Sequence, residues 1–220
     1  MKQNIELPSY RCPKVTPFTI DGNLGKLVWR QARAVRLKNA TGEPRRLQTT
    51  TVRACYSEEA LYLGYRCTDS AIECTFTKRD DPLYTEDTVE AFLCPTGDLH
   101  HYFELEFNAL NTIFDARVFS PHLGRNGMEV ETGWDAPGLK SVVSLSQNRA
   151  GTTVWSVEVR LPFRDLEAPS PKEGDRWRMN LYRIDKADGG EFSAWSQTLT
   201  NPADFHVPAR FGWLEFGGNS

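Results

Sequence analysis

The chain has 220 residues, 40% of them hydrophobic and 25% charged, with a formal net charge of −3 at pH 7. That length suits one large domain with a full hydrophobic core. The small excess of acids argues against nucleic acid or an anionic membrane as the partner, and no apolar run is long enough to span a membrane. No signal peptide is visible within the first 15 residues, which leaves the compartment open.

Short segments with apolar residues at every second position predict β-strands, and several are joined by turns typical of hairpins. The hairpins turn at SEEA, NALN and QNRAGT. In chain order, the predicted hairpins and strands are 51–69, 88–94, 101–119, 140–163, 176–184 and 211–216. These segments predict an all-β chain in which neighbouring strands run antiparallel.

No segment has a sustained helical period, and only residues 162–171, PFRDLEAPSP, favour a single helical turn that ends before the prolines. Residues 37–46 and 120–138 are predicted surface loops. We find no linker and no repeat. The prediction is therefore one domain, an antiparallel β-sandwich or jelly roll, with its core between about residues 15 and 216.

The five cysteines are odd in number and include no CxxC pair, which argues against a zinc or redox site. They are Cys12, Cys55, Cys67, Cys74 and Cys94. We expect most of them to be small buried apolar residues. If the protein is exported, a disulfide between Cys55 and Cys67 across the first hairpin is an alternative.

Strand 88–94 carries an acid in its middle. Alternation places Val89, Ala91 and Leu93 on one face and Glu90 on the other, directly after the loop sequence Tyr-Thr-Glu-Asp. The same rule places Asn180 on one face of strand 176–184 and Arg183 on the other. A carboxylate beside an aromatic loop is the pairing that a sugar site needs, because rings stack on sugar C–H faces and acids hold hydroxyls.

The order of landmarks along the chain resembles one known family. The landmarks are FTIDGNLGKLVW, LYLGYRCTD, EDTVEAFLCP, YFELEFNALNTIFDAR, VWSVEVRLPFRDL, GDRWRMNLYRID, SAWSQT and FHVPARFGWLEF. This series is similar to the family 9 carbohydrate-binding modules and their looser relatives, over nearly the whole chain. The resemblance implies a β-sandwich that binds a sugar, or the end of a glycan chain, without catalysis.

The resemblance also implies a ligand-binding set. Tyr84 and Phe205 correspond to the two aromatic walls that hold the glycan end, and Glu90 to the carboxylate that binds its hydroxyls. Trp195 and Arg183 are expected close by. Asn180 and Glu104 complete the set, with Glu104 at the place where sugar-binding members carry an arginine. Both walls are usually tryptophan in those members, and Pro202 falls near a position where a polar amide is expected. With Glu104, this chain therefore departs from them at four positions.

Family members often carry structural calcium. The acidic segments 78–87 and 184–191 suit such a hard cation, and the sequence alone does not single out individual metal ligands within them.

Other interpretations stay open. Glu90, Glu104 and Glu106 could lie on a water-facing side, paired with arginines of neighbouring strands. The fold could also be a scaffold that has lost its site. Glu90 with Glu104 could mimic a glycoside hydrolase pair. A haem-binding domain would need Met128 or Met179 with His206 or His122 as axial ligands.

Overall fold

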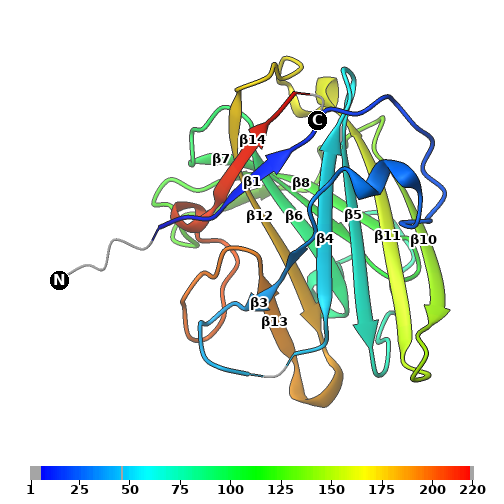
Figure 1. The fold of residues 1–220 in the computed structure, drawn as a ribbon. Coiled ribbons are helices and arrows are strands. Elements are labelled where there is room, and N and C mark those ends of the chain that lie inside the picture. The colour runs from blue at the N-terminus through cyan, green and yellow to red at the C-terminus, as the bar shows by residue number, and fades with distance from the viewer. Residues whose placement is uncertain (1–5, 46, 219–220) are drawn as a thin grey trace.

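Two stacked β-sheets form the described part of the chain, residues 6–45 and 47–218 of a computed structural model (Figure 1). The larger sheet runs β1 (Ser9–Cys12), β14 (Gly212–Phe216), β12 (Arg176–Asp185), β6 (Thr88–Cys94), β7 (His101–Phe107), β8 (Ile113–Phe119) and β9 (Glu129–Glu131), and β13 (Glu191–Ala194) joins β12 to β3 (Lys38–Asn39). The smaller sheet runs β10 (Lys140–Gln147), β11 (Thr153–Pro162), β5 (Ala60–Asp69), β4 (Thr50–Tyr56) and β2 (Val35–Arg36).

Apart from β1 and β14, which pair in parallel, the strand pairs are antiparallel. The three predicted hairpins appear as β4–β5, β7–β8 and β10–β11. No α-helix occurs among the described residues, and the predicted turn near residue 164 is the 3₁₀ helix η3 (Phe163–Leu166). The other 3₁₀ helices are η1 (Leu27–Arg30), η2 (Leu83–Thr85), η4 (Ala187–Gly189) and η5 (Pro208–Arg210). The predicted β-sandwich is therefore confirmed.

The main core lies between the two sheets and follows the predicted alternation. Val89, Ala91 and Leu93 of β6 join Leu61 and Leu63 of β5 in one buried cluster. Their period of two places every second residue of a strand on the inner face. This core therefore sets which side chains of β6 and β12 point away from it.

The outer face of the larger sheet is also buried. Phe92, Tyr182 and Phe211 form a second apolar cluster there, together with side chains from segments 120–132 and 192–211. All seven residues of β6 are buried as a result. Acids on this outer face are consequently removed from water, which the sequence pattern did not predict.

The outer face of the smaller sheet is covered by the N-terminal segment through Glu158. This fully buried carboxylate accepts hydrogen bonds from the backbone N–H groups of Asp21 (2.7 Å) and Gly22 (2.9 Å) and from Nε1 of Trp29 (2.8 Å). Lys26 Nζ supplies a positive charge 2.7 Å away. Glu158 therefore fixes the Ile-Asp-Gly and Trp29 landmarks to the sheet, and it is not a water-facing acid.

All five cysteines are free. The Cys55–Cys67 disulfide is contradicted, because Cys55 pairs with Tyr62 and Cys67 with Thr50 at opposite ends of the hairpin. The two side chains also belong to clusters on opposite faces of the smaller sheet. Burial raises the pKa of Cys55 to about 12, which keeps its thiol protonated.

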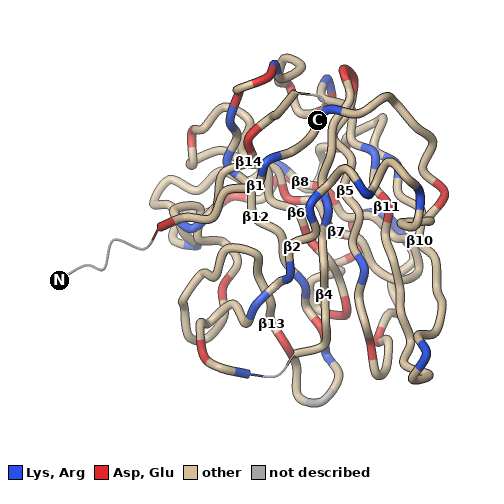
Figure 2. The backbone as a smooth tube through the Cα atoms, viewed as in Figure 1, with Lys and Arg blue, Asp and Glu red and all other residues tan. Residues whose placement is uncertain are grey.

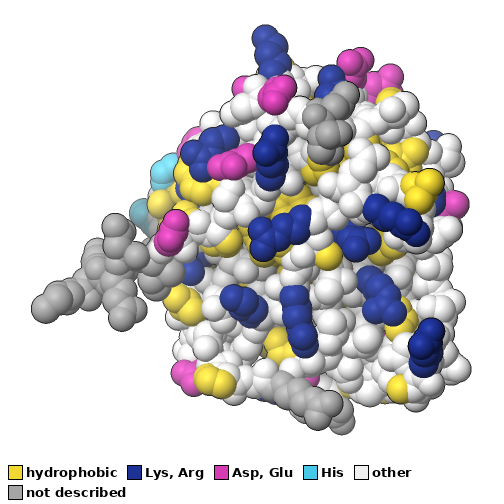
Figure 3. Space-filling view, viewed as in Figure 1, with side chains coloured by type: hydrophobic (Ala, Val, Ile, Leu, Met, Phe, Trp, Pro, Cys, Tyr) yellow, Lys and Arg dark blue, Asp and Glu magenta, His cyan; other side chains and the backbone are white. Residues whose placement is uncertain are grey.

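Charge is unevenly distributed over the surface. On the face that carries β4 and β5, Lys and Arg side chains are spread widely while acidic side chains lie mainly toward the margins (Figure 3), and Figure 2 shows where charged residues lie along the backbone. Arg53 and Arg66 line a shallow hollow on the smaller sheet. Among the described residues, no helix has the length and apolar character needed to cross a membrane.

Candidate functional site

A cavity of about 350 Å³ lies on the outer side of the larger sheet. It is lined by Tyr84, Glu90, Glu104, Phe114, Arg125, Met128, Val130, Thr132, Ile184, Phe192, Ala203, Phe205 and His206. Tyr84 comes from η2, Glu90 from β6, Glu104 from β7 and Phe205 from the segment after β13. The fold thus brings together four residues that the sequence predicted for one site.

Tyr84 projects at the rim of the cavity. It lies in η2, whose Leu83 is fully buried, while Tyr84 is 49% exposed. Its ring meets the Phe114 ring edge to face, with the ring centroids 6.0 Å apart. The chain after η2 is held by Asp87, whose carboxylate accepts N–H groups from Glu73 (2.7 Å) and Lys186 (2.6 Å). An anchored loop therefore presents an exposed ring.

Phe205 is a packed wall and not a projecting ring. It is only 6% exposed and stacks on Tyr182, with ring centroids 4.1 Å apart and an interplanar angle of 12°. The Tyr182 hydroxyl donates a hydrogen bond to the Phe205 carbonyl at 2.9 Å. Phe205 therefore contributes to packing as a member of the second apolar cluster, although it lies in a loop.

Asn180 lies behind that wall and does not line the cavity. Its amide nitrogen donates to the Tyr182 hydroxyl (2.8 Å) and the Ser196 carbonyl (2.9 Å), and its oxygen accepts the Ser196 N–H (2.9 Å). Every one of these partners belongs to the protein. Asn180 therefore orients Tyr182, and through it Phe205, from a buried position.

Arg183 and Trp195 do not lie beside the cavity, contrary to expectation. Strict alternation along β12 turns Arg183 toward the main core, with no bulge to redirect it. Trp195 packs in the same core, edge to face with Tyr10 at 6.3 Å. Nearness of Trp195 to Phe205 in sequence thus does not place them together, because the chain between them crosses from one side of the sheet to the other.

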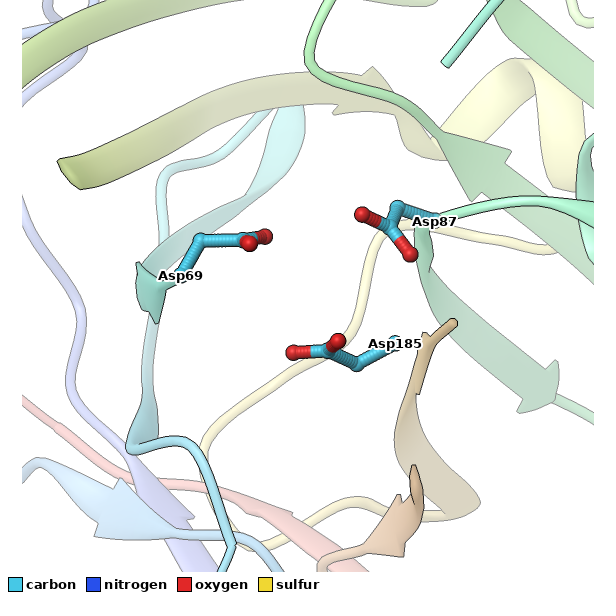
Figure 4. A group of neighbouring side chains, drawn as sticks. All are labelled: Asp69, Asp87 and Asp185. Carbon is cyan, nitrogen blue, oxygen red and sulfur yellow. The ribbon is translucent and has the colours of Figure 1, made fainter. Parts of the chain in front are cut away.

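Three buried aspartates surround Arg183. Carboxylate oxygens of Asp69, Asp87 and Asp185 lie within 4.8 Å of one another, and Figure 4 shows the three side chains converging from separate elements. Nη2 of Arg183 lies 2.8 Å from Asp69 and 2.5 Å from Asp185. The two acidic segments expected to hold calcium thus contribute Asp87 and Asp185 to one cluster, in which an arginine supplies the positive charge. Burial raises the pKa of Asp185 to about 6, partly offset by Arg183.

Three glutamates lie together at the base of the cavity. Glu90 and Glu106 are direct cross-strand partners on β6 and β7, and Glu104 shares their face two residues before Glu106. Oxygens of the three carboxylates lie within 4.8 Å of one another, and their residues are 1%, 4% and 0% exposed for Glu90, Glu104 and Glu106. The water-facing alternative for these acids is therefore wrong.

This glutamate cluster has no cationic partner among the described Lys and Arg side chains. The nearest basic group is Nε2 of His206, 3.7 Å from Glu104. Burial lowers the pKa of His206 to about 4, so the ring is neutral at pH 7. Burial raises the pKa of Glu104 to about 7, and burial with the neighbouring carboxylates raises the pKa of Glu106 well above its usual value. Negative charge is therefore costly in this cluster.

Sequence reasoning missed part of this site. Arg125, on the cavity wall, comes from a predicted loop without a pattern, and it pairs with Asp204 at 2.9 Å. His206 and Met128 line the cavity too, but the Tyr102 hydroxyl contacts Nδ1 of His206 (2.8 Å) and Sδ of Met128 (3.8 Å). Met128 and His206, two of the four potential haem ligands, thus contact Tyr102 within the protein. For Glu106, the sequence does hold a signal. Its spacing of two residues from Glu104 predicts that both side chains lie on the same face of the strand.

Three solved structures share the fold of this chain. A proposed carbohydrate-binding protein from Bacteroides uniformis superposes with a TM-score of 0.77 at 20% identity, covering 94% of this chain and 98% of that one. A family 9 carbohydrate-binding module from Caldicellulosiruptor kristjanssonii matches in its complexes with cellotriose (TM-score 0.68) and glucose (0.65), at 14% identity in both. These alignments cover 97% of this chain and 95% and 97% of the module.

Identities this low show a shared fold alone. A search of curated proteins finds no match. The model of carbohydrate-binding family 9, however, matches residues 24–216, which is most of the chain and includes the strands of both sheets from β2 onward and the whole lining of the cavity. The chain therefore belongs to carbohydrate-binding family 9.

Proposed function

We propose that the protein binds a carbohydrate in the cavity between Tyr84 and Phe205 and does not cleave it. Family membership supports a non-catalytic binding role. Cellotriose and glucose are the ligands bound by the Caldicellulosiruptor module, so glucose and its β-linked oligomers are the first candidates. A single sugar or the end of a glycan chain suits a cavity of about 350 Å³.

The observation that carries the proposal is the pairing of an exposed ring with buried carboxylates in one cavity. Tyr84 offers a partly exposed face for sugar C–H groups, while Glu90 and Glu104 supply acceptors for hydroxyls. A hydroxyl buried without a partner costs roughly 1–3 kcal/mol, so these acceptors would select both orientation and identity of the sugar.

The placement of the acids favours binding without hydrolysis. A glycosidase sets its two carboxyl groups on opposite sides of the scissile bond, about 5 Å or more apart. Here Glu90, Glu104 and Glu106 project from the same face of the adjacent strands β6 and β7. Glu90 and Glu104 line one side of the cavity and Glu106 lies behind them, so a bound sugar would not lie between two of these acids.

The test is titration by calorimetry with glucose, cellobiose, cellotriose, xylose and galactose. Because a tyrosine ring offers less contact area than tryptophan, we expect a dissociation constant on the order of 0.1–1 mM for the preferred sugar. Tyr84→Ala should weaken binding at least about tenfold, the loss of roughly 1.4 kcal/mol.

Phe119→Ala is the matched control. The Phe119 ring is 37% exposed but does not line the cavity, so its removal should leave the affinity unchanged. Equal effects of the two substitutions, or no binding of any sugar, would refute the proposal. Release of glucose from cellotriose during the titration would show that the domain is an enzyme.

A further inference from the structure

We infer that Glu90, Glu104 and Glu106 bind one hard divalent cation of the calcium class at the base of the cavity. Three carboxylates contribute oxygens that lie within 4.8 Å of one another, close enough to share one ion. Each is held on a strand of the larger sheet, so the arrangement is rigid before any ion arrives.

Unsatisfied oxygens point to a missing ligand. Both carboxylate oxygens of Glu106 and Oε1 of Glu90 are buried and have no hydrogen-bond partner of normal geometry among the described residues. Native proteins pair nearly all buried polar atoms, and an exception calls for an unseen ion or water. Glu106 is fully buried, so bulk water does not reach it.

The other acidic clusters of the chain show how this protein normally neutralises grouped carboxylates. Arg183 contacts Asp69 and Asp185 in the aspartate cluster. In a third cluster, formed by Asp80, Asp115 and Asp135, Arg79 contacts Asp115 at 2.6 Å and Asp135 at 2.5 Å. Among the described residues the glutamate cluster alone has no arginine in contact with it. Arg125 lines the same cavity but pairs with Asp204, so a cation from solution would supply positive charge directly at the carboxylates.

The donor set selects the class of ion. Only carboxylate oxygens belong to the group, and His206 is not among its members. Oxygen-only sites favour calcium or magnesium over zinc or copper, which prefer nitrogen and sulfur. Three carboxylates offer up to six oxygens without strict octahedral geometry, which suits calcium better than magnesium.

The position of the cluster suggests what the ion would do. Glu90 and Glu104 line the cavity, while Glu106 lies beneath them without contributing to its lining. An ion held there would keep coordination positions open on the cavity side. If the proposed function holds, two neighbouring hydroxyls of the sugar would fill those positions and bind more tightly when the ion is present.

The experiment is a calorimetric titration of the chelator-treated protein with calcium chloride, and in parallel with magnesium chloride. We expect one calcium site and weaker magnesium binding. Glu106→Gln and Glu90→Gln each remove one charged ligand and should weaken calcium binding at least about tenfold. Asp135→Asn changes the exposed member of the arginine-neutralised cluster and should leave the affinity within about twofold.

Both glutamate variants keep the size of the side chain, and circular dichroism would confirm that they fold. The inference is overturned if the wild type binds no calcium, or if it binds calcium equally well in both glutamate variants. Sugar binding that persists in a protein unable to bind calcium would overturn the cation site and leave the proposed function intact. Calcium binding without sugar binding would support the cation site and refute the proposed function.

Discussion

Two clusters of three buried carboxylates lie on opposite faces of the larger sheet and are neutralised differently. Asp69, Asp87 and Asp185 lie together on the side of the main core, and Asp69 and Asp185 share Arg183, which is itself 1% exposed. The glutamates lie at the cavity, where no described Lys or Arg side chain forms an ion pair with them and the basic group in contact is the neutral His206. A cluster that is closed and self-neutralised serves the fold, whereas one that is open on a cavity and lacks a cation is arranged to bind a ligand.

The largest loss of stability should come from removing the guanidinium group of Arg183. Arg183→Met should lower the free energy of unfolding by about 3–5 kcal/mol, because it leaves buried carboxylates uncompensated. Arg160→Met is the control, since Arg160 pairs with the largely exposed Glu59 and should lose less than about 1 kcal/mol. Urea denaturation measures both values, and similar losses in the two variants would disprove the structural role of the aspartate cluster.

Phe205→Ala should cause the next largest loss of stability. This variant tests whether the cavity wall is part of the core. Loss of a nearly buried ring stacked on Tyr182 should destabilise the protein by about 3 kcal/mol, as well as weaken sugar binding. Tyr84→Ala should cost less than about 1 kcal/mol, since that ring is half exposed. Thermal and urea unfolding of the two variants compare them, and equal stability would mean that Phe205 is not packed as described.

The same chemical change should have opposite signs in the two clusters. Asp69→Asn weakens charged hydrogen bonds from Arg183 and from Nε1 of Trp155 (3.0 Å), and should destabilise by roughly 1.5–3 kcal/mol. Glu106→Gln, in chelator at pH 7, removes a buried acid with no partner and should stabilise. Destabilisation by both substitutions would remove the distinction between the clusters.

The pH dependence of stability should sharpen the contrast further. Burial and its neighbours raise the pKa of Glu106, so the folded metal-free protein retains a proton that the unfolded chain releases above about pH 4.3. Wild-type stability should therefore fall as pH rises from about 4.3 toward 7. Glu106→Gln should flatten this decline, so its advantage over wild type grows with pH. Urea denaturation at pH 5 and pH 7 in chelator measures the difference, and a pH-independent advantage would contradict the shifted pKa.

Much of the fold was predictable because strand alternation is a local property of the sequence. The period of two correctly placed Val89 and Glu90 on opposite faces of β6, and it turned Arg183 toward the core. The hairpin turns were predictable for the same reason, since each depends on a few adjacent residues.

The burial of the outer face was not predictable from the same patterns. Segments 120–132 and 192–211 fold over the larger sheet by long-range contacts. The spacing of apolar residues along the sequence does not predict which loop covers which strand. The glutamates therefore looked like solvated strand residues. Arg183 and Trp195 were assigned to the site by resemblance, although the alternation of β12 already pointed Arg183 away from it.

The comparison of the two clusters can be tested most directly by anomalous diffraction from crystals soaked in terbium(III), an oxygen-seeking substitute for calcium. We expect a peak among the carboxylates of Glu90, Glu104 and Glu106 and none among Asp69, Asp87 and Asp185, where Arg183 already contacts Asp69 and Asp185. A peak at the aspartates, or an empty glutamate cluster, would contradict it.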